Sequence, residues 1–335
     1  MKIAILDDYQ DTIRTLDCFR KIAGHDVTIW NDHTKDVETL AQRLQNTEAL
    51  ALLRERTPIT AALVNKLDNL RIVSQVSVYP HIDVDACTKC GVLVCSDTGT
   101  HVSYGTAELT WGLILASFRR IPQEMAALKS GRWQTETVGL CLRGKTLGIY
   151  GYGRVGRVVA GYGRAFGMDV QVWGRESTIA KARADGYSIA ESKSKFFGEC
   201  DVLSLHVRLL PETKGMVSAE DLGLMKPTSL LVNTSRAGLI QPGVLERALK
   251  TGRPGMAAVD VYGEEPVLGA QHPLLALDNV VCTPHLGYVA REELERMFGK
   301  IFDQILAYEK GSPINVVNPE ALKTQRETAP AGGAQ

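Results

Sequence analysis

A glycine-rich turn at residues 151–156 constrains the fold of this 335-residue chain more than any other feature. The sequence Gly151-Tyr152-Gly153-Arg154-Val155-Gly156 follows an apolar run at 146–150 and precedes a helical pattern. By itself GxGxxG is a weak signal, but between a strand and a helix it is the arrangement that binds a dinucleotide pyrophosphate. Gly151 would allow the tight turn, Gly153 a close approach of the backbone to the phosphates, and Gly156 close packing of the helix on the sheet. The amides of Arg154 and Val155 would face the pyrophosphate, and a glycine turn without a ligand is the less favoured alternative.

Short apolar runs alternate with longer helical patterns along the chain, which is typical of parallel α/β sheets. Strands are predicted at 2–6, 27–30, 49–53, 71–75, 93–95, 146–150, 169–173, 202–206, 229–233, 256–261 and 280–282. Helices are predicted at 36–45 and 60–66, as one long helix over 104–129, and at 291–310. Because 335 residues exceed what one core usually serves, two domains are expected. The predicted fold class is α/β, with two Rossmann-like doubly wound parallel-sheet domains and a cleft between them.

The composition argues against several classes of partner. Lys plus Arg and Asp plus Glu number 38 each, so no net charge attracts nucleic acid or anionic lipid. No apolar stretch approaches the roughly 20 residues that span a bilayer, and the first apolar run is too short for a signal peptide. Seven scattered cysteines suggest reduced thiols, and Cys87 and Cys90 lack the further ligands of a zinc site. We therefore expect a cytoplasmic protein with a small-molecule substrate and without metal, membrane or nucleic-acid partners.

The end of the strand predicted at 169–173 bears on the choice between NAD and NADP. Enzymes that use NAD carry an acidic residue about 20 residues beyond the glycine motif, where it binds the ribose hydroxyls. In this chain Gly174 takes that position and Arg175 follows it. Without the carboxylate a 2′-phosphate is not repelled, and the guanidinium can bind it. The sequence favours NADP over NAD, with a surface ion pair between Arg175 and Glu176 as the alternative.

Three charged or titratable side chains follow three successive predicted strands. Arg236 follows the strand at 229–233, Glu265 that at 256–261, and His285 that at 280–282. The carboxyl ends of parallel strands line the ligand crevice of an open sheet, so these side chains would converge on one site. Individually, a surface ion pair, a helix cap or a satisfied polar group would explain each of them. Their joint placement after the glycine motif favours a catalytic site.

This set of residues suits the reduction of a carbonyl group. His285 would donate a proton to the oxygen while hydride reaches the carbon. Glu265 would orient the imidazole and favour its protonated form. Arg236 would bind a substrate carboxylate and polarise the neighbouring oxo group, which indicates a 2-oxo acid. Asp260 would accept a hydrogen bond from the nicotinamide amide, unless it is a buried structural residue.

Five motifs in order resemble the D-isomer-specific 2-hydroxyacid dehydrogenase family. They are the glycine motif and the segments 205–215, 233–238, 260–266 and 284–287. The resemblance implies Arg236, Glu265 and His285 as catalytic residues. It also implies a substrate domain formed by residues 1–98 and 287–322, an NAD(P)-binding domain over 99–286, and a homodimer joined through the latter. A tail at 323–335, rich in Ala, Gly, Pro and Thr, is expected to be disordered.

Residue patterns and resemblance together define the predicted sites. The cofactor-binding residues are Gly151, Gly153, Arg154, Val155, Gly156, Gly174, Arg175, His206, Val207, Thr234, Ser235, Asp260 and Gly287. The substrate residues are Arg54, Ser77, Val78 and Arg236. A surface ion pair with Glu55 or Glu48 is the alternative for Arg54. The loop at 75–83 departs from the family, because Val76 and Val78 replace residues that elsewhere let loop amides reach the substrate carboxylate.

Two other functions remain open at the level of the sequence. One is a nucleotide-sensing, non-catalytic dimeric interaction protein on the same fold, which the complete set of Arg236, Glu265 and His285 argues against. The other is a dehydrogenase that acts on a substrate other than a hydroxy acid, which the altered loop at 76–79 allows. Oxidation of NAD(P)H by the pure protein with simple 2-oxo acids would separate the enzyme from the sensor.

Overall fold

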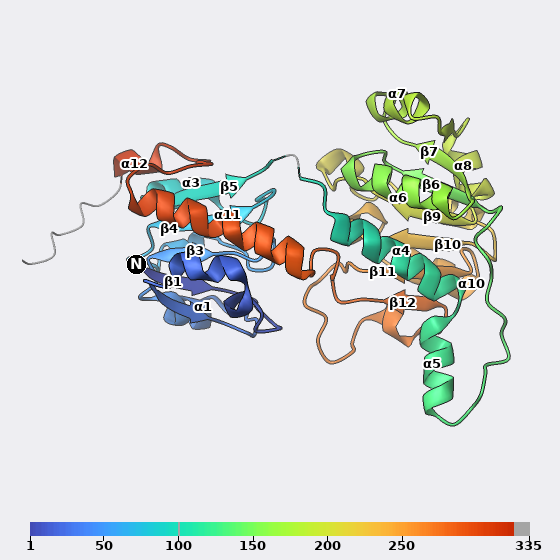
Figure 1. Ribbon diagram of the computed structural model, residues 1–335, viewed down its shortest axis with the longest axis horizontal. Helices are drawn as coiled ribbons and strands as arrows, with labels where there is room; N and C mark the ends of the chain where they lie inside the picture. The colour runs from blue at the N-terminus through green and yellow to red at the C-terminus, as the bar shows by residue number, and fades with distance from the viewer. Residues whose placement is uncertain (100, 325–335) are drawn as a thin grey trace, which may run out of the picture. The chain divides into compact units, whose positions relative to one another are not determined.

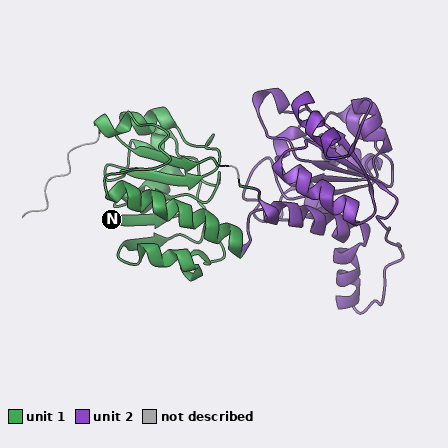
Figure 2. Cartoon of the chain, turned by 45° about the horizontal axis from the view of Figure 1, so that its top comes forward, with its two compact units in different colours: residues 1–101, 291–335 green, residues 102–290 purple. Residues whose placement is uncertain are grey.

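The computed structural model describes residues 1–99 and 101–324, which form two compact units (Figure 2). Unit 1 contains the described residues up to His101 and those from Arg291 onward, and unit 2 contains Val102–Ala290. The domain boundaries predicted from the sequence lie after residues 98 and 286. The fold class predicted for the two units, Rossmann-like α/β with parallel sheets, is confirmed.

The predicted disordered tail lies mostly outside the described residues. Its first two residues, Lys323 and Thr324, are described and belong to the short helix α12 (Ala321–Thr324), so disorder was the wrong prediction for them. Hydrogen bonds explain their order, because Lys323 N donates to Glu320 O and Thr324 Oγ1 donates to Thr88 O.

Unit 1 is built on a five-stranded parallel sheet with the order β2-β1-β3-β4-β5 (Figure 1). The strands are β1 (Lys2–Ile5), β2 (Asp26–Ile29), β3 (Ala49–Ala51), β4 (Ile72–Val76) and β5 (Leu93–Asp97). This is a doubly wound order in which the direction of winding reverses between β1 and β3. Loops that follow such neighbouring strands open a crevice at the carboxyl edge of the sheet.

Helices cover both faces of this sheet. One face packs against α1 (Val37–Leu44), α2 (Ala61–Val64) and α3 (Val84–Lys89). Each of the three begins at a residue whose side chain accepts a hydrogen bond from the helix backbone: Asp36, Thr60 and Asp83. Such caps satisfy amides that have no partner within the helix. Two 3-10 helices, η1 (Ile13–Thr15) and η2 (Asp17–Ile22), follow β1.

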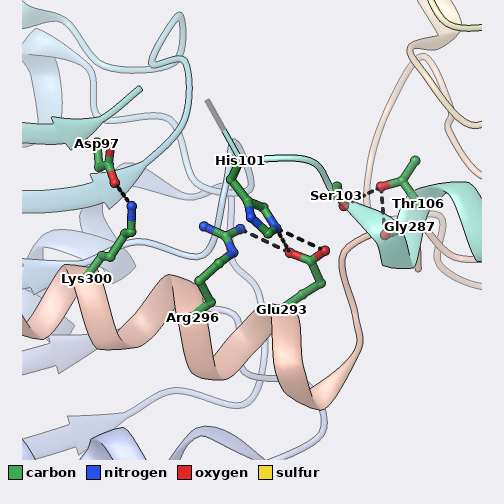
Figure 3. Close-up of polar contacts among 8 residues, drawn as sticks. All are labelled: Asp97, His101, Ser103, Thr106, Gly287, Glu293, Arg296 and Lys300. Atoms are coloured by element: carbon green, nitrogen blue, oxygen red, sulfur yellow. Dashed lines mark hydrogen bonds and ion pairs between the residues drawn. The ribbon is translucent and has the colours of Figure 1, made fainter. Parts of the chain in front are cut away.

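The second face of the unit 1 sheet lies against the long helix α11 (Arg291–Glu309). Its buried Phe298, Ile301, Phe302 and Ile305 repeat at helical spacing, as expected for a helix with one core-facing stripe. Ion pairs tie the helix to the end of β5 and the chain after it: Lys300 pairs with Asp97, and Glu293 pairs with His101. Within the helix, Glu293 also pairs with Arg296 (Figure 3). None of the described helices combines the length and apolar character needed to cross a membrane.

Unit 2 is built on a seven-stranded parallel sheet with the order β12-β11-β10-β9-β6-β7-β8 (Figure 1). The strands are β6 (Thr146–Tyr150), β7 (Asp169–Trp173), β8 (Ser188–Ile189), β9 (Val202–Leu205), β10 (Leu230–Asn233), β11 (Met256–Val259) and β12 (Val280–Cys282). The order reverses between β6 and β9, and dinucleotides bind at such a point in Rossmann sheets.

Two helical layers sandwich the unit 2 sheet. One face packs on α4 (Tyr104–Phe118), α6 (Arg154–Ala165) and α7 (Glu176–Ala184), and the other on α8 (Lys193–Glu199), α9 (Ala219–Leu224) and α10 (Val244–Thr251). Alternate strand residues enter the two cores: Ile149 lies in the first and Tyr150 in the second. Three 3-10 helices, η3 (Pro211–Thr213), η4 (Ala237–Leu239) and η5 (Pro273–Ala276), complete the unit.

Most predicted strands and helices differ from the structure by at most two residues at either end, and two elements differ more. The single helix predicted over 104–129 is two helices, α4 and α5 (Ile121–Lys129), which separate at Arg120. Arg120 adopts a left-handed conformation with φ +53°, and Pro122 lies in the first turn of α5, where its missing amide hydrogen costs nothing. The two-residue strand β8 was not predicted, because two residues show no periodicity.

Candidate active site

The glycine motif forms the turn between β6 and α6. Gly151 has φ +97°, and a Cβ at this residue would lie 2.7 Å from the carbonyl oxygen of His206. A Cβ at Gly156 would lie 2.3 Å from the carbonyl oxygen of Gly151, so the helix can approach the strand this closely only with glycine there. Gly153 caps the helix without a side-chain hydrogen bond, and a Cβ there would meet nothing within 4 Å. The helix N-terminus is therefore open to a phosphate at Gly153.

The residues predicted to select the cofactor follow β7. Gly174 lies close to the glycine turn, since a Cβ on it would be 3.7 Å from Gly151 Cα. Arg175 is exposed and precedes the first residue of α7. The alternative ion pair between Arg175 and Glu176 is not formed in the described structure.

Side-chain hydrogen bonds hold the residues that follow β9 and β10. Ser235 Oγ donates to the carbonyl oxygen of Val207 at 2.7 Å, and Thr234 Oγ1 lies 2.7 Å from Thr110 Oγ1 on α4. His206 Nε2 lies 2.9 Å from Ser204 Oγ. The protein atoms packed around His206 lower its pKa to about 4, so the ring is neutral at neutral pH.

Arg236 follows β10 in extended backbone conformation. Its Nη1 donates to Ser235 O at 2.7 Å, and its own carbonyl oxygen accepts from Asn233 Nδ2 at 3.0 Å. The Asn233 side chain also accepts from the Ser235 amide, so it holds both ends of the turn that carries the arginine. Asn233 was not singled out from the sequence, although an Asn at a strand end is a common turn-forming residue.

His285 and Glu265 are in direct contact. His285 Nδ1 lies 2.6 Å from Glu265 Oε2, and the two side chains are 19% and 22% exposed. Glu265 Oε1 accepts from the Tyr262 amide at 2.9 Å, which fixes the carboxylate from its other side. His285 has φ +55°, an uncommon conformation for a non-glycine residue. The ring of Tyr288 packs edge-on against the imidazole.

Asp260 is fully buried at the end of β11 and holds the turn that contains His285. Its Oδ1 accepts from Thr283 Oγ1 at 2.6 Å and from the Leu286 amide at 2.7 Å, and its Oδ2 accepts from the Gly287 amide at 2.9 Å. Burial raises the pKa of Asp260, and these hydrogen bonds oppose the shift. The structural interpretation of Asp260 thus has direct contacts in its support.

The Gly287 end of the same turn is held from α4. Thr106 Oγ1 donates to the Gly287 carbonyl oxygen at 2.8 Å and contacts Ser103 Oγ (Figure 3). A Cβ on Gly287 would lie 3.2 Å from Thr106 Oγ1 and 3.3 Å from Asp260 Oδ2. Together with Asp260, this contact gives the turn at 285–287 a defined position at the edge of the unit 2 sheet.

The remaining predicted substrate residues belong to unit 1. Arg54 follows β3 with φ +59°, and Ser77 follows β4 with φ +97°. Val78 is the next residue, and the loop lies at the carboxyl edge of the unit 1 sheet. The structure thus brings Arg236, Glu265 and His285 to one edge in unit 2 and the other three residues to one edge in unit 1.

No metal site is evident in the part of the chain that the structure describes, because no three His, Cys, Asp or Glu side chains are grouped as ligands.

The thiols of Cys87 and Cys200 are buried, which raises the pKa of each to about 12. Thiols with such pKa values are protonated and unreactive at neutral pH.

Comparison with known proteins identifies the family. The model of the NAD binding domain of the D-isomer specific 2-hydroxyacid dehydrogenases matches residues 111–287. The chain is 37% identical over 316 residues to glyoxylate reductase of Aeropyrum pernix, with 90% of this chain and 92% of that protein covered. The D-3-phosphoglycerate dehydrogenase of Methanocaldococcus jannaschii is also 37% identical, and the match covers 84% of this chain but only 53% of that longer protein.

Solved structures agree with this result. A phosphoglycerate oxidoreductase from Vibrio cholerae O395 has 46% identity and a TM-score of 0.89 over 93% of this chain and 99% of its own. An oxidoreductase from Ralstonia solanacearum has 49% identity and a TM-score of 0.93 over 96% and 98% of the two chains. The chain therefore belongs to the D-isomer specific 2-hydroxyacid dehydrogenase family, and it is an oxidoreductase that acts on CH–OH groups with NAD or NADP.

Proposed function

We propose that the protein is a D-2-hydroxyacid dehydrogenase that reduces small 2-oxo acids and prefers NADPH. The 2.6 Å contact between His285 Nδ1 and Glu265 Oε2 carries this proposal. It lies at the carboxyl edge of β11 and β12, and Arg236 follows the neighbouring strand β10. A guanidinium, an imidazole and a carboxylate that holds the imidazole are the groups that carbonyl reduction of an acid requires.

The unit 2 sheet edge fits a dinucleotide. A Cβ at Gly151 or Gly156 would clash with backbone atoms, so only glycine allows the turn and the helix to pack this closely. With the open helix N-terminus at Gly153, these residues form a cradle that larger side chains would close. The proposed cofactor residues are Gly151, Gly153, Arg154, Val155, Gly156, Gly174, Arg175, His206, Val207, Thr234, Ser235, Asp260 and Gly287. When bound there, the nicotinamide supplies a hydride for reduction or accepts one in the reverse direction.

In the proposed mechanism each catalytic side chain has one task. The Glu265 contact occupies His285 Nδ1, so Nε2 is the atom that gives the proton to the oxo group during reduction and takes it back during oxidation. Glu265 stabilises the imidazolium and keeps the ring from turning. Arg236 binds the substrate carboxylate and draws electron density from the oxo oxygen, which makes the carbon a better hydride acceptor.

The assignment of roles to the two units is part of the proposal. Unit 2 would bind the cofactor, and Arg54, Ser77 and Val78 are the substrate residues proposed for unit 1. The left-handed conformations of Arg54 and Ser77 support this role, because backbone conformations that cost energy tend to occur at functional sites.

We also propose that the protein is a homodimer joined through unit 2. Exposed apolar side chains are concentrated on α5 and the segment after it, where α5 extends away from the rest of unit 2 (Figure 1). They are Ile121, Met125, Leu128, Trp133 and Val138. Changing Leu128 to Glu should convert the dimer into a monomer in analytical ultracentrifugation; a monomeric parent would contradict this proposal.

A reducing compartment such as the cytoplasm fits the seven unpaired cysteines.

Changing Arg175 to Ala is expected to raise the KM for NADPH by about tenfold or more, and the KM for NADH by less than about twofold. The guanidinium would bind only the 2′-phosphate, and a charge-assisted hydrogen bond has about this strength. Titration of both cofactors at a fixed 2-oxo acid concentration measures the effect. Arg183→Ala, which removes an exposed arginine elsewhere on α7, is the matched control. Equal losses for the two cofactors would refute the preference for NADP.

The proposed function is tested by a kinetic panel. Purified protein is mixed with NADPH or NADH and with glyoxylate, hydroxypyruvate, pyruvate or phenylpyruvate, and absorbance at the nicotinamide band is followed. At least one 2-oxo acid should be reduced, with the D-isomer of the hydroxy acid as product where the product is chiral. If none of them is reduced while the cofactor binds, a nucleotide-sensing protein becomes the better explanation.

A further inference from the structure

We infer that Thr106 and Thr110 on α4 are positioning residues of the active site. Their hydroxyl groups hold the turns that carry Arg236 and His285 at a fixed spacing for one small substrate. The inference rests on the proposed function, because it gives the two threonines a task in the proposed reaction. It concerns unit 2 alone.

The spacing between these turns matters because the strands that carry them are not neighbours. Arg236 follows β10 and His285 follows β12, and β11 lies between the two strands in the sheet. In the proposed reaction the arginine binds the carboxylate and the histidine the oxo oxygen, and these groups sit on neighbouring carbon atoms of a 2-oxo acid. A small displacement of one turn would separate its side chain from the substrate, and such misplacement can cost about 10²-fold in rate.

Two threonines on one face of α4 contact one turn each. Thr106 Oγ1 donates to the Gly287 carbonyl oxygen at 2.8 Å (Figure 3). One helical turn further along, the fully buried Thr110 Oγ1 lies 2.7 Å from Thr234 Oγ1. Residues four apart lie on the same face of a helix, so both hydroxyl groups face the strand ends. Each contacted residue lies two positions from the catalytic side chain of its turn.

The number of hydroxyl protons fixes the direction of these bonds. Thr110 Oγ1 also donates to the Thr106 carbonyl oxygen at 2.7 Å, and a hydroxyl group has a single proton. Both bonds of Thr110 exist together only if Thr234 donates to it. In the same way Ser103 Oγ donates to Thr106 Oγ1 at 2.8 Å, because the proton of Thr106 goes to Gly287. Each threonine hydroxyl is therefore donor and acceptor at once, and valine, with nearly the same shape, can be neither.

The helix itself is fixed to the sheet. Ile114 and Phe118 of α4 are buried in the same core as Val232 of β10 and Ala258 of β11. A close-packed core transmits a displacement and does not absorb it. The two threonines therefore tie both turns to one rigid body.

The structure also contains two costs that this role explains. His285 has a left-handed backbone, which is unfavourable for a residue other than glycine, so its turn needs restraint. Threonine is a weak helix former, and α4 carries two of them where alanine would favour the helix more. Both costs are accounted for if the hydroxyl groups hold the site.

Each turn contains backbone amides that report its opening. In the turn at 285–287, the amides of Leu286 and Gly287 donate to the Asp260 carboxylate. In the turn at 234–236, the Ser235 amide donates to Asn233 Oδ1 at 3.1 Å. Hydrogen–deuterium exchange at these amides measures how often each turn opens, and the measurement needs neither substrate nor cofactor.

The test removes each hydroxyl group at nearly constant shape. Thr106→Val should speed exchange at the 286–287 amides about fivefold, as expected for one lost hydrogen bond, and leave exchange at Ser235 unchanged. Thr110→Val should do the reverse. With saturating NADPH, Thr106→Val should lower kcat about tenfold at a similar KM, because the proton donor is displaced. Thr110→Val should raise the KM for the best 2-oxo acid about tenfold, because the carboxylate-binding arginine is displaced.

Matched variants separate the hydroxyl groups from the stability of the helix. Thr106→Ser and Thr110→Ser keep the hydroxyl group, and should restore the exchange rates and the kinetics of the parent within about threefold. Ser117→Ala removes a buried hydroxyl group of the same helix that has no hydrogen-bond partner within residues 1–99 and 101–324. This control should change neither exchange nor kinetics.

Unchanged exchange in both valine variants, or slower turnover that the serine variants share, would overturn the inference. If the buried Thr110→Val variant does not fold, the Thr106 variants decide the question alone. A parent protein that reduces no 2-oxo acid would instead overturn the proposed function, and the exchange measurements would still test the hold of the threonines on the turns.

Discussion

Changing Arg236 to Ala is expected to lower kcat/KM for 2-oxo acid reduction by about 10²–10³-fold or more, while the affinity for NADPH changes by less than about threefold. The arginine lies on a turn held at both ends by Asn233, so its guanidinium reaches the sheet edge from a fixed backbone. In the proposed mechanism it binds the substrate carboxylate and stabilises charge on the oxo oxygen, and alanine does neither. Steady-state kinetics and a cofactor titration measure the two effects separately.

Two further variants determine what the arginine contributes. Arg236→Lys keeps the charge but cannot make two parallel hydrogen bonds, and should recover only a small part of the activity. Arg183→Ala, on the exposed side of α7, should behave as the parent. If Arg236→Ala turned over as fast as the parent protein, the role proposed for this residue would be wrong.

Most strands could be predicted because each is a short apolar run between turn residues, and the central strands β9 and β10 of unit 2 are buried on both faces. The predicted ranges of β6, β7 and β12 agree with the structure. The break between α4 and α5 was missed because apolar residues continue through it. The interruption depends on the backbone of Arg120, and a left-handed arginine has no marker in the sequence except the nearby Pro122.

Two glycines of α6 also show what cannot be predicted from the sequence alone. Gly163 in α6 looks unfavourable from the sequence, but a Cβ there would lie 2.4 Å from Leu147 Cδ2 on β6. Close packing of the helix on the sheet therefore requires it, and only the tertiary structure shows this. Gly161 in the same helix would meet nothing within 4 Å, and nothing in the structure explains it.

The residues of the candidate site also fall into those that the sequence could predict and those that it could not. Arg236, Glu265 and His285 could be proposed from the sequence because each follows a recognisable strand, and parallel topology brings strand ends together. The residues around them could not be found, since Asn233, Tyr262 and Thr283 act through one or two hydrogen bonds to backbone or carboxylate groups. The substrate loop shows the difficulty most clearly. Val76 and Val78 are the residues by which the sequence of this loop departs from the family, whereas the residue with the strained backbone is Ser77 between them.

Glu265 and His285 are expected to behave as one unit when both are changed. His285→Asn keeps a donor at the position of Nδ1 but has no group at that of Nε2, and should lower kcat by about 10²–10⁴-fold. Glu265→Gln should lower it by about 10²-fold for a specific geometric reason. The carboxylate accepts from the Tyr262 amide with one oxygen and from His285 with the other. Glutamine has one oxygen for these two donors, so one contact must be lost.

The double variant distinguishes this pairing from two independent contributions. If Glu265 acts only by orienting and stabilising the imidazole, then once His285 is gone the second change has nothing left to affect. Glu265→Gln with His285→Asn should therefore be no slower than His285→Asn alone, within about threefold, instead of multiplying the two losses. Glu199→Gln, an exposed glutamate at the end of α8, is the control for a change of charge. Multiplicative losses in the double variant would mean that Glu265 acts on the reaction separately from His285, and the dyad proposed here would have to be abandoned.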